Sequence, residues 1–197
     1  MDARLVAWAR AVKARRGRAA SRLPPLWLFT DAARLGDPRA AVARPPRGLA
    51  GVVLRDDALA GRALLARDLA RLCRARRLWL SVAGDWRLAA AVKAGVHLRA
   101  GRRAGAMPRW LPTPTGSAHG VADLLRARRA GAAVAFLSPV FATGSHPGAA
   151  AMGPLRWGLA VRRVGRAGAL GGVDGAACRR FSRAACIAVG AMTALGK

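Results

Sequence analysis

The segments LSPVFATGSHPG (residues 137–148) and ALGGVDG (residues 169–175) decide the fold of this chain. Each is an apolar run that ends abruptly in small and polar residues. Buried strands of a parallel β/α barrel have this form, because both strand faces are covered and binding groups begin where the strand ends. In the second segment, Gly171 and Gly172 free backbone N–H groups to face an anion, and the N-terminus of the following helix adds positive potential. The pair predicts a phosphate site.

From residue 23 onward, short apolar runs alternate with helix-length amphipathic segments, the pattern of repeated βα units. Pro112 and Pro114 cannot donate to a strand ladder, so the fifth strand is expected to be short or irregular. Eight strands are expected, over 26–31, 49–55, 78–83, 94–98, 110–115, 133–137, 167–170 and 185–191. Helices are expected over 58–76, 121–129, 155–164 and 175–180. The sequence therefore predicts a compact α/β TIM (β/α)8 barrel.

Residues 1–22 are predicted to form a basic leader helix, followed by a single barrel domain over residues 23–197. Leu5, Trp8, Ala9 and Val12 recur at i, i+3, i+4 and i+7 and form one apolar stripe. Only MTALGK follows the eighth strand, so the final helix is truncated. Because a barrel must cover the outside of its closing strands, the leader helix or a second subunit of a homodimer is expected to fill this gap.

The formal net charge of +26 raises the question of nucleic-acid binding. The chain has no Glu, Asn, Gln or Tyr and almost no Lys, which is typical of codon bias that replaces Lys with Arg. Aromatic residues do not interleave with the basic runs as in single-strand readers. We therefore expect no specific nucleic-acid partner, and polyanion binding as the physiological role is kept as a separate hypothesis.

The sequence favours a cytoplasmic location without a membrane partner. The leader has charges within its apolar stretch, unlike a secretory signal, and no run reaches the roughly 20 apolar residues of a membrane span. Cys73, Cys178 and Cys186 lack the close spacing of a zinc site and are expected to be buried thiols.

The order of the motifs LWLFTD, GVVLR, AGVHL, GSAH, SPVFATGSHP, LGGV and ACIAVGAM resembles the thiamine-phosphate synthase and TenI superfamily over nearly all residues from 23 onward. The resemblance implies a TIM barrel of thiamine biosynthesis that binds the phosphate of a thiazole phosphate or of thiamine phosphate after strands seven and eight. The matching phosphate-binding positions are Gly171, Gly172, Gly190 and Ala191. An alternative is that Gly171 and Gly172 only form a tight turn.

The synthase branch joins a pyrimidine diphosphate to a thiazole phosphate and needs Mg²⁺, and this chain departs from its pattern. Val53 stands at the Gln position of the second strand and Asp57 at the Lys position, while Arg55 is kept. Of the Asn-Asp pair only Asp85 remains, and Arg102 replaces the second carboxylate. No cofactor or metal ligand is therefore firmly implied, and Mg²⁺ enters only with the synthase alternative.

The resemblance to the TenI branch implies a thiazole tautomerase, which needs an acid/base and an anion site but no metal. His119 matches the His of the SxH motif and is the predicted catalytic residue, with helix capping or a bond to a nearby carbonyl as the alternative. Asp85 has helix capping as its alternative. His97 is expected to be buried. The predicted substrate-binding residues are Arg55, Asp85, Ser117, Thr143, Ser145 and His146.

The function that the sequence favours is a TenI-like thiazole tautomerase acting on a phosphorylated thiazole. The alternatives are a thiamine-phosphate synthase with a remodelled diphosphate site and a non-catalytic barrel that only binds a phosphorylated ligand.

Overall fold

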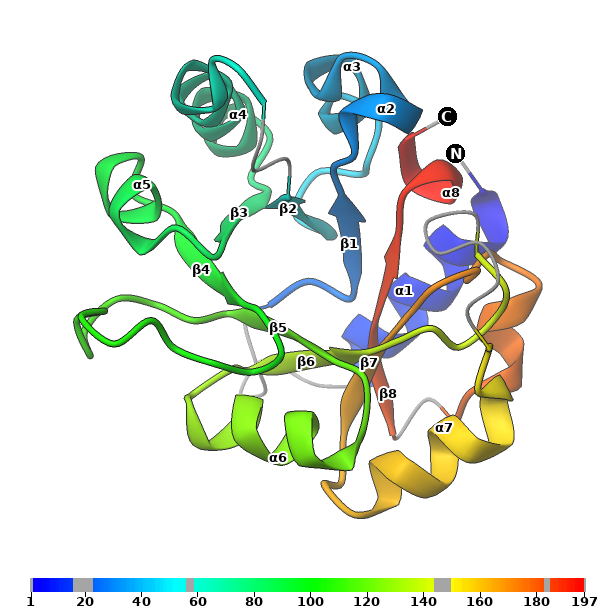
Figure 1. The fold of residues 1–197 in the computed structure, drawn as a ribbon. Helices are drawn as coiled ribbons and strands as arrows, with labels where there is room; N and C mark the ends of the chain where they lie inside the picture. Colours follow the sequence, from blue (N-terminus) through cyan, green and yellow to red (C-terminus); the bar gives the residue numbers. More distant parts are fainter. Residues whose placement is uncertain (1, 16–22, 56–58, 144–149, 183–184, 197) are drawn as a thin grey trace.

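Eight parallel strands close into a barrel in the order β1 to β8, which confirms the predicted TIM (β/α)8 fold (Figure 1). The computed structural model describes residues 2–15, 23–55, 59–143, 150–182 and 185–196. The strands are β1 (Leu26–Phe29), β2 (Ala50–Leu54), β3 (Trp79–Ala83), β4 (Gly95–Leu98), β5 (Thr115–Ala118), β6 (Val134–Leu137), β7 (Ala167–Leu170) and β8 (Cys186–Ala191).

Helices surround the barrel and follow most of its strands (Figure 1). They are α1 (Ala3–Arg15), α2 (Ala32–Leu35), α3 (Pro38–Val42), α4 (Arg62–Ala75), α5 (Trp86–Ala91), α6 (Val121–Arg129), α7 (Gly153–Arg162) and α8 (Thr193–Gly196). The helix expected over 175–180 is a 3₁₀ turn, Ala177–Arg180, and α2, α3 and α5 are short helices that the apolar periodicity did not single out. No helix in the described part of the chain is long and apolar enough to cross a bilayer.

The fifth strand lies later than the sequence predicted. The expected strand over 110–115 is wrong, because β5 begins at Thr115, after both prolines. The proline segment still borders the sheet through its carbonyl groups: Pro112 O accepts from Val96 N–H at 2.8 Å and Pro114 O accepts from Val134 N–H at 3.0 Å. Proline lacks the N–H that a strand needs but keeps the carbonyl acceptor. Pro112 and Pro114 therefore accept hydrogen bonds from the neighbouring strands without donating any, and the regular strand begins only at Thr115.

The barrel interior is filled by aromatic rings that rest on glycines of neighbouring strands. Trp27 and Phe136 meet edge to face at 6.2 Å between ring centroids, and Phe29 meets Phe136 at 5.2 Å. A methyl group at Gly51, Gly168 or Gly190 would lie 2.5 to 2.6 Å from Trp27, Phe136 or Phe29, respectively. The glycines are therefore required by the rings, because a small barrel has no spare volume.

Alternate strand residues face outward and form a second, larger core with the helices. Leu26, Leu28, Val52 and Leu54 are fully buried there. The three cysteines, Cys73, Cys178 and Cys186, are buried and carry free thiols, as predicted.

The leader helix α1 supplies part of this outer core. Leu5, Trp8, Ala9 and Val12 are buried in the same cluster as Leu195 of α8, and α1 passes behind β8 in the view of Figure 1. The Asp2 carboxylate accepts hydrogen bonds from Arg4 N–H and Leu5 N–H within α1 and from Gly175 N–H beyond β7. Lys13 Nζ donates to Gly48 O at 2.9 Å near the start of β2. The α1 helix thus covers part of the outer surface of the barrel that the four-residue α8 does not cover.

Removing buried contacts of α1 should destabilise the whole barrel. Leu5 is fully buried, so Leu5→Ala should lower the free energy of unfolding by about 2–5 kcal/mol. Leu155→Ala, the same change at a side chain that is 82% exposed on α7, should lower it by at most about 0.5 kcal/mol. Urea denaturation followed by circular dichroism measures both. Equal effects of the two variants would show that α1 is not part of the cooperative core.

Candidate functional site

The parallel strands bring most of the predicted site residues to one end of the barrel. Arg55 follows β2, Asp85 comes shortly after β3, His119 follows β5 and Gly171 follows β7. Gly190 and Ala191 end β8, and Ser117 lies in β5. Thr143 is on the connection from β6 to α7. Ser145 and His146 lie outside the described residues, so the structure does not place them.

Gly171 and Gly172 are held beside the end of β8 and beneath the loop that follows β6. Leu170 is in register with Gly190, so the glycine pair lies next to the last residues of β8. Val140 N–H donates to Leu170 O and Phe141 N–H donates to Gly171 O, both at 3.0 Å. The carbonyls of Leu170 and Gly171 are used in this way, whereas no acceptor within the described residues takes the N–H of Gly171 or Gly172.

Both glycines also have a conformational reason to be glycine. Their φ angles are +93° and +63°, in the region that favours glycine. A methyl group would lie 2.9 Å from Pro139 at Gly171 and 2.5 Å from Ala142 O at Gly172. A tight turn by itself thus explains why both residues are glycine. The observation that supports a binding role is a different one, the two N–H groups that have no acceptor within the described residues.

Gly190 and Ala191 are strand residues rather than loop residues. The bare Cα of Gly190 faces the barrel interior, where an added methyl group would meet Phe29 and Leu170. Ala191 is buried and in register with Leu28 of β1. Their predicted contact with phosphate stays a prediction, and the structure adds a packing role for Gly190.

His119 is exposed, and one of its ring nitrogens is engaged. Nδ1 lies 3.1 Å from the backbone oxygen of Ser138, at the end of β6. Because a carbonyl oxygen only accepts hydrogen bonds, Nδ1 carries the proton, and Nε2 of the neutral ring has its lone pair available. The side chain bonds a neighbouring carbonyl and does not cap α6, whose N-cap is Gly120.

The backbone of His119 is fixed by the first turn of α6. Its N–H donates to Asp123 Oδ2 at 3.0 Å, and Arg126 donates to Asp123 Oδ1 at 2.6 Å. Burial by itself raises the pKa of Asp123, but these two hydrogen bonds outweigh it and hold the pKa below its ordinary value. Asp123 therefore stays ionised and holds the start of the helix that carries His119.

Ser117 and Asp85 are engaged with the protein itself. Ser117 Oγ accepts from Ala100 N–H at 3.0 Å and so ties the loop after β4 to β5. Asp85 is the N-cap of α5, where Oδ1 accepts from Leu88 N–H at 2.9 Å, which confirms the capping alternative. Its other oxygen lies 3.5 Å from Arg62, which also donates to Ala83 O.

The ends of β3 and β4 do not fit a divalent metal ion. Asp85 is the only carboxylate between residues 79 and 102, and its two oxygens are engaged by a helix N–H and a guanidinium. The Arg99 side chain lies over Gly84, where an added methyl group would be 2.8 Å from Nε. Mg²⁺ is held by oxygen ligands in octahedral geometry, and cationic guanidinium groups stand in their place here. No group of three His, Cys, Asp or Glu suited to a metal occurs among the described residues.

A buried polar cluster that was not predicted as a unit lies in the barrel interior, below the strand ends that form the mouth of the barrel. His97 is buried in the barrel as expected, with Nδ1 2.9 Å from Thr115 Oγ1 and its ring edge-on to Phe29. The Thr115 hydroxyl donates onward to Ser81 Oγ at 3.4 Å, so His97 Nδ1–H is the donor to Thr115. Inward residues of β3, β4 and β5 form this chain, and alternation along each strand was the signal for it.

Comparisons with known proteins agree with the barrel. The family model described as thiamine monophosphate synthase matches residues 38–195. Thiamine phosphate pyrophosphorylase from Pyrococcus furiosus has a similar fold, with a TM-score of 0.64 and 18% identity over 87% of this chain and 86% of that one. A structure described as native KDPGal gives a TM-score of 0.59 and 12% identity over 86% and 82% of the two chains. These two likenesses show the fold alone. No curated protein matches the chain by sequence.

The burial of His97 predicts a dependence of stability on pH. Burial first, and then the positive charge of Arg55, lower the pKa of His97 to about 3. Below the ordinary histidine pKa of about 6.5, the unfolded chain binds a proton that the folded chain refuses, so stability falls as pH falls from about 6.5 toward 3.

Urea denaturation of the wild type and of His97→Gln measures this effect. From about pH 6 to pH 4 the wild type should lose up to about 1.4 kcal/mol per pH unit more than the variant. Above about pH 7.5 the two stability curves should run parallel, since both side chains are neutral there. Parallel curves throughout would contradict the buried, neutral histidine.

Proposed function

The chain belongs to the thiamine monophosphate synthase family, and from this premise we propose that it is a thiazole tautomerase that binds a thiazole phosphate at the mouth of its barrel. The N–H groups of Gly171 and Gly172 bind the phosphate. His119 takes a proton from one position of the ring and returns it at another. Arg55 and Thr143 contact the ligand, with Ser145 and His146 of the following segment.

One connected set of contacts carries the proposal. His119 Nδ1–H donates to Ser138 O, Pro139 follows and packs on Gly171, and Phe141 N–H donates to Gly171 O. The ends of β5, β6 and β7 are thereby locked together, and β8 is in register beside them. The candidate base and the candidate phosphate site therefore have a fixed relation, which proton transfer on a bound phosphate ester requires.

The protonation state of His119 suits a base that also acts as an acid. With Nδ1–H committed to Ser138 O, the lone pair of Nε2 can accept a proton from the ligand. The resulting imidazolium keeps the same hydrogen bond, so no rearrangement is needed before Nε2 returns the proton. One nitrogen can thus both take and return the proton, as a tautomerisation needs.

The residues at the ends of β3 and β4 favour proton transfer over pyrimidine transfer. Coupling a pyrimidine diphosphate to the thiazole would use Mg²⁺ to stabilise the departing diphosphate. That ion is not matched by Asp85, whose carboxylate caps α5, by the Arg99 side chain over Gly84 or by Arg102 in the next loop. A thiamine-phosphate synthase remains the second candidate, supported by the family match and by Arg55.

Replacing His119 should remove catalysis and spare binding. In His119→Asn the side-chain amide can still donate to Ser138 O, but no group replaces the Nε2 base. The tautomerisation rate, followed by NMR with the thiazole phosphate, should fall at least about 100-fold. The dissociation constant from calorimetry should change less than about threefold, because the phosphate contacts are separate.

Arg163→Gln, a change of an exposed residue at the end of α7, is the matched control and should keep the full rate. The thiazole alcohol without phosphate should bind at least about tenfold more weakly than the ester. Normal turnover in His119→Asn would remove the histidine from the mechanism. Tight binding of the ester by a wild type without turnover would instead identify a non-catalytic binder.

The two enzymatic candidates differ in their need for metal. Tautomerisation should proceed equally with EDTA and with Mg²⁺, since no step uses the ion. Incubation with pyrimidine diphosphate and thiazole phosphate should yield no thiamine phosphate under either condition, as measured by chromatography. Robust Mg²⁺-dependent synthesis would establish the synthase and refute the preference for the tautomerase.

A further inference from the structure

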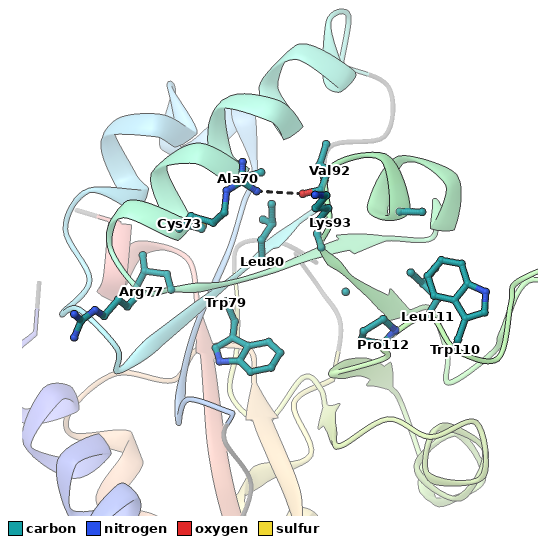
Figure 2. A pocket seen from close by; sticks show the side chains of 15 residues that line it. Ala70, Cys73, Arg77, Trp79, Leu80, Val92, Lys93, Trp110, Leu111 and Pro112 are labelled. Atoms are coloured by element: carbon teal, nitrogen blue, oxygen red, sulfur yellow. Dashed lines mark hydrogen bonds between the residues drawn. The ribbon is translucent and has the colours of Figure 1, made fainter.

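A hollow of about 580 Å³ lies at the opposite end of the barrel from the mouth, and nothing in the proposed reaction uses it (Figure 2). It opens where α4 ends and where β3 and β4 begin. Its volume is in the range of pockets that hold small molecules, which are mostly apolar with a few placed polar groups. Leu80, Val92 and Leu111 form part of its apolar lining.

Two tryptophans flank the hollow with much of their surface in solvent. Trp79 is 38% exposed and Trp110 is 74% exposed, whereas Trp8, Trp27 and Trp157 are buried. Figure 2 shows the two indoles on either side of Pro112. An exposed indole leaves a large apolar face unpaired, and stacking with a planar ring is the contact that this face makes best.

Cations lie beside this hollow along one side of α4. Arg67, Arg71 and Arg74 recur at i, i+4 and i+7, on one face of that helix, and with Lys93 they line an adjoining hollow of about 440 Å³. Arg74 donates to Val92 O across the hollow at 3.4 Å, and Arg71 pairs with Asp68 at 3.2 Å. No carboxylate is among the described residues that line either hollow.

Lys93 is held at this rim by the end of α5. Its φ is +54°, a conformation in which glycine is usual. Lys93 N–H donates to Ala90 O and Ala94 N–H donates to Ala89 O, which closes the helix end around it. Arg77, whose φ is +55°, ends α4 in the same way, so both cationic side chains start from fixed backbone positions beside the hollow.

From this combination we propose a second ligand site, which binds a nucleoside di- or triphosphate. The base stacks on Trp110, and the phosphates lie along Lys93, Arg74 and Arg67. Several cations in a row beyond the rings match a ligand with more than one negative charge better than they match a simple aromatic acid. Stacking on indole tolerates every base, so the site selects the class of ligand and not one base.

Calorimetry and tryptophan fluorescence with ADP, at physiological salt, test the site. Trp110→Ala should weaken ADP binding about tenfold or more. The change is at an exposed side chain, and an unchanged melting temperature verifies the fold. Lys93→Glu should weaken binding by a similar factor, whereas Arg163→Glu just after α7, with the same change in net charge, should alter it less than about threefold.

Inorganic tripolyphosphate separates a site from the attraction of a strongly basic chain. It should bind more weakly than ADP and be indifferent to Trp110→Ala, since it has no ring. Saturating thiazole phosphate should leave the ADP titration unchanged, because that ligand belongs to the other end of the barrel. Absence of ADP binding, equal affinity for tripolyphosphate, equal effects of Lys93→Glu and Arg163→Glu, or displacement by thiazole phosphate would each overturn the proposal.

Discussion

The structure depends on the fit of aromatic rings against glycines in the barrel interior. Each ring crosses from its own strand to a bare Cα on a neighbouring strand: Trp27 to Gly51, Phe136 to Gly168, and Phe29 to Gly190. Close packing allows no side chain where a ring already lies, so the pairs fix which residues face inward. A shift of one residue in the strand register would turn every side chain to the other face. These contacts therefore also fix the register of the barrel.

The same fixed register arranges the mouth. With Leu170 opposite Gly190, the chain after β7 turns at Gly171 and Gly172 directly under the loop that leaves β6. That loop carries Ser138 O, whose hydrogen bond with Nδ1 fixes the ring of His119 just after the end of β5. A packing requirement deep in the barrel is thereby transmitted through backbone hydrogen bonds to the groups that would contact a ligand. Preorganisation of this kind is how a rigid scaffold aligns a base with a substrate.

Basic residues give the two ends of the barrel different characters. At the mouth, Arg62 and Arg99 surround the end of β3, where the remaining carboxylate, Asp85, is occupied as a helix cap. At the opposite end, arginines of α4 and Lys93 border an apolar hollow with exposed indoles. The fold thus gathers some of the cations behind the net charge of +26 at these two places, although the composition alone is typical of codon bias.

The sequence by itself determined the barrel, the leader helix and the strand ends that carry Arg55, His119 and Gly171, because burial on both faces and helical periodicity are local patterns that survive in the letters. It placed α6 over Val121–Arg129 as observed, yet it misplaced β5, since a strand edge can be continued by proline carbonyls that no propensity reveals. Only the tertiary structure decided that Asp85 caps a helix, that Gly190 seats Phe29 and that His97, Thr115 and Ser81 form one chain. The contacts of Gly190 and of His97 depend on which residues of different strands meet across the barrel, and such distances are set by register and packing rather than by spacing along the chain.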